Sequence, residues 1–271
     1  MSEILNMLSY HFMQRALIVG VLVSLCAALL GVSLVLKRFS MIGDGLSHVG
    51  FGALAVASAL GLAPLAVAVP VVVAAAVFLL RLRKSSRVKG DAAIAIISSS
   101  ALSIGVITVS LTTGMNTEVS SYMFGSVLSL SRGDAVLSVV LSLAVLALFV
   151  LLYPRIFAVT FDEDFSRATD TNTELYNTLL AVLTAVTVVL GMRMMGALLI
   201  SSLIIFPALA AMRLCKSFKA VVITAGAMSV ACFLAGLTGS YFLETPTGAS
   251  IVAADLIAFA AACAIGRVHR A

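Results

Sequence analysis

Residues 16–36 decide the fold of this chain: they read ALIVGVLVSLCAALLGVSLVL, and Lys37 and Arg38 follow directly. A helix of this length covers roughly 30 Å, which is the thickness of the hydrocarbon core of a bilayer. Eight further apolar stretches follow, near residues 42–62, 64–80, 92–112, 134–153, 176–192, 195–212, 220–240 and 249–266. We count nine membrane spans, or eight if the short stretches within 42–80 or 176–212 are broken or re-entrant.

The composition places the chain among membrane proteins. Hydrophobic residues make up 62% of the 271 residues and charged residues only 11%, whereas a soluble domain carries roughly 25% charged residues. Outer-membrane barrels alternate apolar and polar residues, while the apolar runs here are unbroken. We therefore predict an all-α polytopic membrane protein whose residues 1–271 form a single transmembrane domain in a lipid bilayer. The basic residues lie between the spans and not on one face, which argues against a nucleic-acid partner.

The basic residues also predict the orientation of the chain. If Lys37 and Arg38 are cytoplasmic and the spans alternate, all but three of the 17 Lys and Arg residues fall in cytoplasmic segments. Only Arg15, Arg132 and Arg193 remain outside this pattern. By the positive-inside rule, the N-terminus is outside, the C-terminus is inside, and the number of spans is odd.

Two connections between the spans stand out. The outer stretch 113–133 contains a short apolar piece, residues 121–130, which is too short to span and either dips into the membrane or caps a cavity. The largest cytoplasmic loop, residues 154–175, contains the charged segment Asp162-Glu163-Asp164-Phe165-Ser166-Arg167-Ala168. We expect this segment to be helical and to lie outside the bilayer. It is either a solvated connector or a docking helix for a cytosolic partner.

Asp44 and His48 are the most informative polar residues within the spans. Four residues separate them, so on a helix they share one face, roughly 6 Å apart along the axis. Burying these groups in hydrocarbon is costly, and such residues usually mark a transport path or pair with one another. The sequence leaves both interpretations open: a structural couple that locks two helices, or a site on a transport path. Gly43 and Gly45 are small residues that let another helix approach closely.

A carboxylate and an imidazole form half of a site for a divalent metal. In a symmetric dimer, two copies of this helix would supply two Asp and two His ligands, which suits zinc or manganese. Pro207 lies inside an apolar span, where it frees a backbone carbonyl and kinks the helix. Met192, Met194 and Met195 are expected to fill the core rather than bind metal, and we interpret Asp255 as a structural buried acid.

No phosphate-binding glycine loop and no HExxH motif occur in the chain. A serine–histidine–aspartate set is also implausible, because His48 is the only histidine within the spans. We therefore do not expect an enzyme.

Several segments in order resemble a known family, the membrane permeases of ABC importers for zinc, manganese and iron. The resemblance runs nearly end to end, and the matching segments are residues 35–48, 91–96, 124–128, 196–208 and 241–249. The first contains the motif Asp-x-x-x-His at Asp44 and His48, the fourth is the span from Gly196 to Pro207, and the segment Asp162 to Ala168 looks like the family's coupling segment. One departure is Asp170, where the family often has glycine; aspartate tolerates left-handed backbone better than most residues.

The resemblance implies a homodimeric permease in a bacterial cell membrane. It would be served by two cytosolic ATPase subunits and by an extracytoplasmic metal-binding protein. Asp44 and His48 would contact the transported ion transiently, with no permanently bound cofactor, and the sequence does not identify the metal. Two alternatives remain: a single-chain secondary carrier that uses the Asp–His pair as a proton relay, or an ABC permease for a metal chelate or vitamin.

Overall fold

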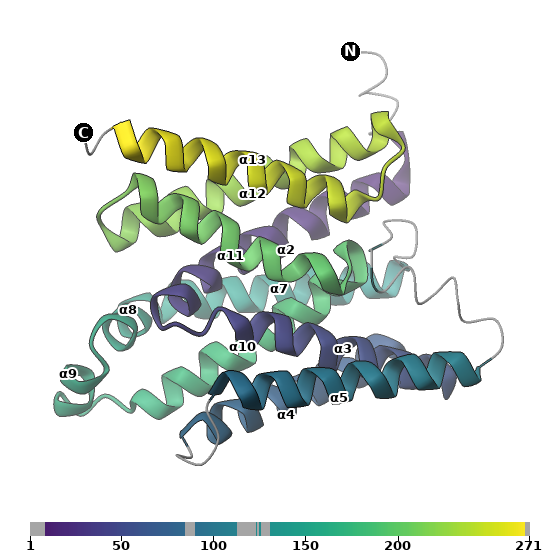
Figure 1. Cartoon of the computed structure of the whole chain (residues 1–271), viewed down its shortest axis with the longest axis horizontal. Helices are drawn as coiled ribbons and strands as arrows, with labels where there is room; N and C mark the ends of the chain where they lie inside the picture. The colour runs from purple at the N-terminus through teal and green to yellow at the C-terminus, as the bar shows by residue number, and fades with distance from the viewer. Residues whose placement is uncertain (1–8, 85–89, 113–122, 124, 126–130, 269–271) are drawn as a thin grey trace.

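Each apolar stretch forms one long helix in the computed structural model, which describes residues 9–84, 90–112, 123, 125 and 131–268. Nine helices of 18 or more residues occur in this described part, and they lie along one another in a bundle (Figure 1). They are α2 (His11–Leu36), α3 (Met41–Ala59), α4 (Pro64–Lys84), α5 (Gly90–Leu111), α7 (Arg132–Leu151), α10 (Thr173–Met195), α11 (Ala197–Leu214), α12 (Phe218–Leu243) and α13 (Thr247–Val268). The predicted all-α membrane fold is confirmed.

Seven of the nine helices are long and apolar enough to cross a membrane by length and composition alone. Of the other two, α3 contains Asp44 and His48, which lower its hydropathy. Helix α11 is apolar over most of Ala197–Leu214, although one of its side chains lies outside the described residues. These two helices pack against each other, so the helix that contains the polar pair lies beside a strongly apolar one.

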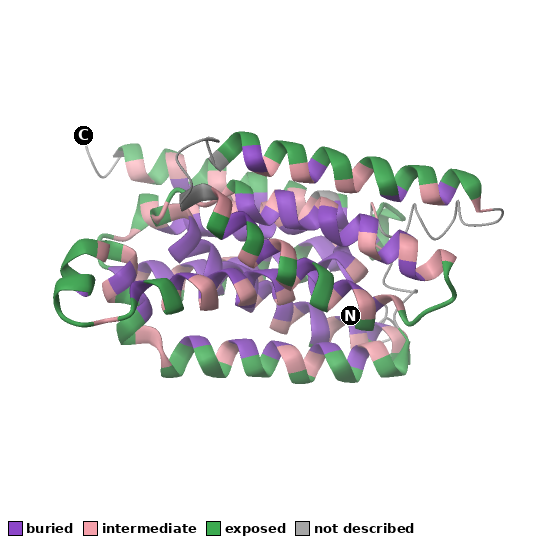
Figure 2. Ribbon diagram, turned by 90° about the horizontal axis from the view of Figure 1, so that it is seen from below, coloured by how far each residue is buried: buried purple, intermediate pink, exposed green. Residues whose placement is uncertain are grey.

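The helices divide into a buried middle and an exposed periphery. In the most apolar windows of α10 and α2, 72% and 67% of residues are buried, against 22% in α5 and in α13. Figure 2 shows the buried residues gathered in the middle of the bundle and the exposed ones on the outer helices. Helix α3 lies against α4, α5, α10 and α11. Helix α5 thus covers α3 on one side and leaves its own far face exposed.

Close contacts between helices depend on glycine. A Cβ atom on Gly52 of α3 would lie 2.5 Å from the backbone oxygen of Ala101 on α5, and one on Gly45 would lie 2.6 Å from Ile94 Cγ2. A Cβ atom on Gly43 would lie 3.0 Å from the Ile204 side chain of α11. Helix α3 therefore approaches α5 more closely than a side chain at position 52 would permit, whereas at position 43 the Ile204 side chain would have to move by a few tenths of an ångström.

One end of the bundle collects the basic residues, and we call it the basic end. It is the left-hand end in Figure 1, where α2 ends, α3 and α5 begin, and α13 ends. The corner helices α8 (Tyr153–Phe161) and α9 (Glu163–Ala168) also lie there. The helix predicted for residues 162–168 is confirmed as α9, which begins where the Asp162 side chain accepts a hydrogen bond from the Phe165 backbone N–H. The outer piece predicted at 121–130 lies outside the described residues, apart from Met123 and Gly125.

Candidate functional site

Asp44 and His48 lie together on α3, as their spacing predicts. Asp44 is in the first turn of the helix, and His48 Nε2 lies 3.8 Å from Asp44 Oδ2. This distance exceeds that of a hydrogen bond, so the two atoms face each other without being tied together. The side chains are 21% exposed for His48 and 41% for Asp44. The His48 Nδ1 atom is buried and has no hydrogen-bond partner among the described residues.

A serine from another helix positions the aspartate. Ser201 Oγ of α11 donates a hydrogen bond of 3.1 Å to Asp44 Oδ1. One carboxylate oxygen is therefore held by α11, while the other faces the imidazole. Sequence analysis did not identify Ser201, although two hydroxyls at 201–202 in an otherwise apolar span were a visible signal.

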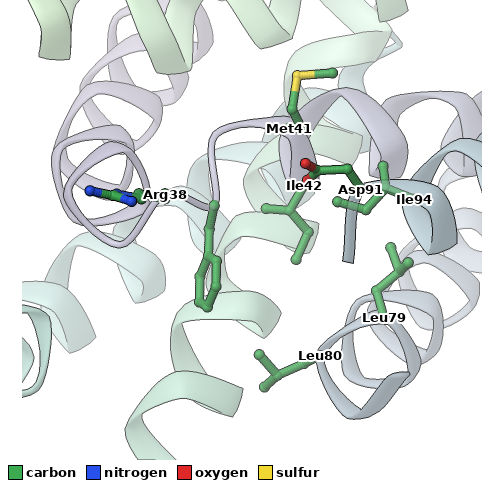
Figure 3. Close-up of a pocket in the computed structure, with 8 residues that line it drawn as sticks. Arg38, Met41, Ile42, Leu79, Leu80, Asp91 and Ile94 are labelled. Atoms are coloured by element: carbon green, nitrogen blue, oxygen red, sulfur yellow. The ribbon is translucent and has the colours of Figure 1, made fainter. Parts of the chain in front are cut away.

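The pair opens into a pocket between α3 and α5. Besides Asp44 and His48, its walls are formed by Met41, Asp91, Ile94, Ala95, Ser98, Ser99 and Leu102. A second pocket, nearer the basic end, shares Met41, Asp91 and Ile94 with the first. Figure 3 shows this second pocket, where Asp91 projects from α5 toward Met41 and Ile42 at the start of α3. Asp91 thus lines both pockets, together with Asp44 and His48 in the first and with Arg38 in the second.

One chain supplies only two metal donors at this place. Among the residues that the structure describes, no three side chains of His, Cys, Asp or Glu lie close enough to hold one ion together. Zinc in proteins usually takes four ligands, at least three of them from protein. The geometry therefore matches a half-site, which needs donors from water or from a second chain.

A charged network ties α9 to the neighbouring helices. Lys37 Nζ, just after the end of α2, lies 3.3 Å from Glu163 Oε2 and also donates a hydrogen bond to Asn177 Oδ1 of α10. Asn177 Nδ2 and Arg167 Nη2 each donate to Glu163 Oε1, both at 3.2 Å. The Lys37 side chain is only 6% exposed. By contrast, the Phe165 side chain on α9 is 63% exposed.

The network also sets the charge of Glu163. Burial of the carboxyl would by itself raise its pKa. The hydrogen bond from Asn177 and the charges of Lys37 and Arg167 outweigh burial and hold the pKa of Glu163 below its ordinary value of 4.5. Asp170, just beyond α9, has a φ of 60°, the left-handed conformation for which glycine is usual.

The other residues singled out from the sequence lie at a helix break, inside a helix or in the packed core. Gly196, with a φ of 89°, forms the break between α10 and α11, and Pro207 lies inside α11. Met192, Met194 and Met195 are at most 1% exposed and belong to the core. Asp255 of α13 is 2% exposed; within the described part of the chain its two oxygens make no hydrogen bond of ordinary geometry, and the Cys232 thiol of α12 lies beside them.

Comparison with known proteins gives a consistent picture. The family model described as the ABC 3 transport family matches residues 9–266. The chain is 30% identical to the high-affinity zinc uptake system membrane protein ZnuB of Haemophilus influenzae, over 92% of this chain and 96% of ZnuB. It is 27% identical to the manganese import system permease protein ScaB of Streptococcus gordonii, over 92% and 90% of the two chains. The fold is similar to that of a chain in the structure of PsaBC from Streptococcus pneumoniae in complex with Fab, with a TM-score of 0.87, 27% identity and coverage of 96% and 94%.

Proposed function

The chain belongs to the ABC 3 transport family and is the membrane permease of an ABC importer, and we propose that it carries a divalent transition-metal ion, zinc, manganese or iron, past Asp44 and His48. ATP hydrolysis belongs to a partner ATPase, and a binding protein supplies the ion. The observation that carries the proposal is the Asp44–His48 pair. It is a partly exposed carboxylate–imidazole half-site that opens into a pocket between two helices.

We propose that the working permease is a homodimer. A second copy would bring another aspartate and histidine to the ion and complete a set of four oxygen and nitrogen donors. The exposed face of α5 next to the pocket supports this arrangement, because the small hydroxyl residues Ser99 and Ser103 lie there among apolar side chains such as Ile96. Small hydroxyl residues are enriched where membrane helices pack against one another.

We propose that α9, with the segment Asp162 to Ala168, receives the motion of the ATPase. Two ATPase subunits in the cytoplasm would each contact one copy of this helix through exposed side chains such as Phe165. Glu163 passes displacement of α9 to Lys37 at the end of α2 and to Asn177 at the start of α10. Residues 37–40 connect α2 directly to α3. Asp44 is in the first turn of α3, directly after this connection. Lys37, which receives the displacement of α9, and the ion site are therefore close along the chain.

The proposed orientation places the basic end in the cytoplasm of a bacterial cell, with a multi-pass chain whose N-terminus is outside. An extracytoplasmic metal-binding protein would deliver the ion at the opposite end. Asp44, at the start of α3, then lies in the inner half of the membrane. Few and weak ligands suit a transient stop, because an ion held too tightly would not leave.

Uptake of radioactive zinc and manganese into liposomes tests this function. The liposomes contain the permease with its ATPase and binding protein. Asp44→Ala or His48→Ala should abolish ATP-dependent uptake while the assembled complex and its yield stay normal. Ser202→Ala, which removes a polar group from α11 next to Ser201, is the control and should transport normally. Normal uptake by the Asp44 and His48 variants would refute the site, and uptake without ATP would favour a gradient-driven carrier.

A further inference from the structure

Asp91 is an acidic residue that the proposed site leaves unused. It lies in the first turn of α5, is exposed, and lines both the pocket that contains Asp44 and His48 and the neighbouring pocket of Figure 3. Figure 3 shows its carboxylate directed toward the start of α3. A charged side chain at the mouth of an ion pocket acts on any cation that passes through it.

The packing of α3 on α5 gives the depth of Asp91 relative to Asp44. A Cβ atom on Gly45 would meet Ile94 and Ser98, and one on Gly52 would meet Ala101. Both helices begin at the basic end, so they run in the same direction. Residues 93–97 of α5 are therefore level with Asp44. Asp91 lies about one helical turn, roughly 5 Å, closer to the basic end, while His48 lies about one turn deeper.

Asp91 is a separate group and not a third ligand of the same ion. Within the described part of the chain, no three His, Cys, Asp or Glu side chains are close enough to share a metal ion. His48, Asp44 and Asp91 instead follow one another along the wall of one pocket toward the basic end. This order of an imidazole and two carboxylates is what a cation would meet on its way out.

We propose that Asp91 is an exit station, a second and weaker binding place to which the ion moves from Asp44 and His48 before it reaches the cytoplasm. The inference rests on the proposed function, because it concerns the next step on the same path. The transported ion keeps its charge and exchanges ligands; no covalent step is involved.

The size of the effect follows from Coulomb's law. The attraction between a divalent cation and a carboxylate about 6 Å away in water corresponds to a factor of about ten in a rate or equilibrium constant. This attraction already acts on an ion at Asp44, and it doubles when the ion comes to about 3 Å from Asp91, so Asp91 also lowers the barrier to release. Removing its charge should weaken binding at the first site by up to about tenfold and slow release from it by about tenfold.

Asp91→Asn in the assembled complex tests the proposal with zinc alone as the probe. Two quantities are measured: the Kd for zinc of the resting complex, and the rate of ATP-dependent zinc uptake into liposomes. We expect uptake at saturating zinc about tenfold slower than wild type and a Kd weaker by no more than about tenfold. Asp91→Glu should restore most of the rate, because it restores the charge. Glu174→Gln is the matched control: it removes an acid from the first turn of α10 at the same end of the bundle, and it should leave both quantities unchanged.

The outcomes separate the exit station from the function on which it rests. Loss of zinc binding in Asp44→Asn, with wild-type uptake in Asp91→Asn, would overturn the exit station and leave the proposed function standing. Loss of zinc binding in Asp91→Asn as complete as in Asp44→Asn would also overturn it, because Asp91 would then be a ligand of the first site. Failure of Asp91→Glu to recover the rate would show that charge is not what matters at this position.

Discussion

Replacing Ser201 by alanine is the most direct test of how the ion site is held in position. The serine hydroxyl donates a 3.1 Å hydrogen bond to Asp44 Oδ1 from a helix 157 residues further along the chain. Ser201→Ala leaves the Asp44 and His48 side chains intact and removes only the group that orients the carboxylate. It therefore separates positioning of the ligand from the ligand itself.

The expected magnitude follows from the geometry. Loss of a group that orients a metal ligand typically costs about 10- to 100-fold in metal affinity. Asp44 is 41% exposed, so water can replace part of the lost bond, and we take the lower end of the range, about tenfold per protomer. If both protomers of a homodimer contribute Asp44 to one ion, two serines are lost, and the two effects together approach 100-fold, or about 2.7 kcal/mol.

Zinc binding to the purified permease, measured by competition with a chelating dye, gives this number directly. Ser202→Ala is the control, because the next residue on a helix points about 100° away. Unfolding temperatures of both variants should match wild type within a few degrees. A zinc Kd unchanged in Ser201→Ala would refute the idea that α11 positions the ligand, whereas a shift near tenfold and not near 100-fold would argue against two copies of Asp44 at one ion.

Three further changes probe the network, the packing and the buried acid. Because the folded-state pKa of Glu163 is lowered, its stabilisation is fully present above pH 4.5 and is lost as pH falls from there through the lowered value. The difference in unfolding temperature between wild type and Glu163→Gln should therefore be constant from neutral pH down to about pH 4.5 and then shrink. Gly52→Ala should destabilise the protein by about 1–3 kcal/mol, since its Cβ would lie 2.5 Å from a backbone oxygen of α5, while Gly239→Ala, with open space around it, should not destabilise it in the same chemical-unfolding assay. Asp255→Leu should raise the unfolding temperature, because it removes two buried oxygens whose contact with the weak S–H donor of Cys232 does not replace an ordinary hydrogen bond; a lower temperature would mean that the contact with Cys232 is stabilising.

Hydropathy predicted the helices well because lipid permits few other structures. A chain in hydrocarbon must satisfy its backbone hydrogen bonds internally, so an apolar stretch of the right length forms a helix. The bounds differ at the ends: residues 220–240 were predicted, whereas α12 runs from Phe218 to Leu243. The helix begins where Ser217 accepts a hydrogen bond from the Ala220 backbone N–H and ends at Glu244, which is left-handed. Capping groups are polar, and hydropathy does not detect them.

The site was only partly predictable for a different reason. Asp44 and His48 are one turn apart, so local helix geometry brings them together. Ser201 reaches Asp44, and Lys37 reaches Glu163 across 126 positions, only through the packing of separate helices. Glycine at 43, 45 and 52 hinted that α3 has close neighbours, but a single sequence does not say which helices they are.

The position of Asp44 in the first turn of α3 links the proposed action of the ATPase on α9 to the proposed route of the ion. In the first turn of a helix, the backbone N–H groups have no intrahelical partners, and they favour a carboxylate nearby. Rearranging this turn costs little free energy, because these N–H groups break no intrahelical hydrogen bonds when they move. Residues 37–40 connect this turn to Lys37, which Glu163 of α9 holds by its charge. A displacement of α9 therefore reaches Asp44 through a few residues of backbone, while Ser201 holds the carboxylate from the opposite side on α11. On this proposal, moving α9 relative to α11 would pull Asp44 away from Ser201. The carboxylate would then be held less firmly, and the site would release the ion toward Asp91.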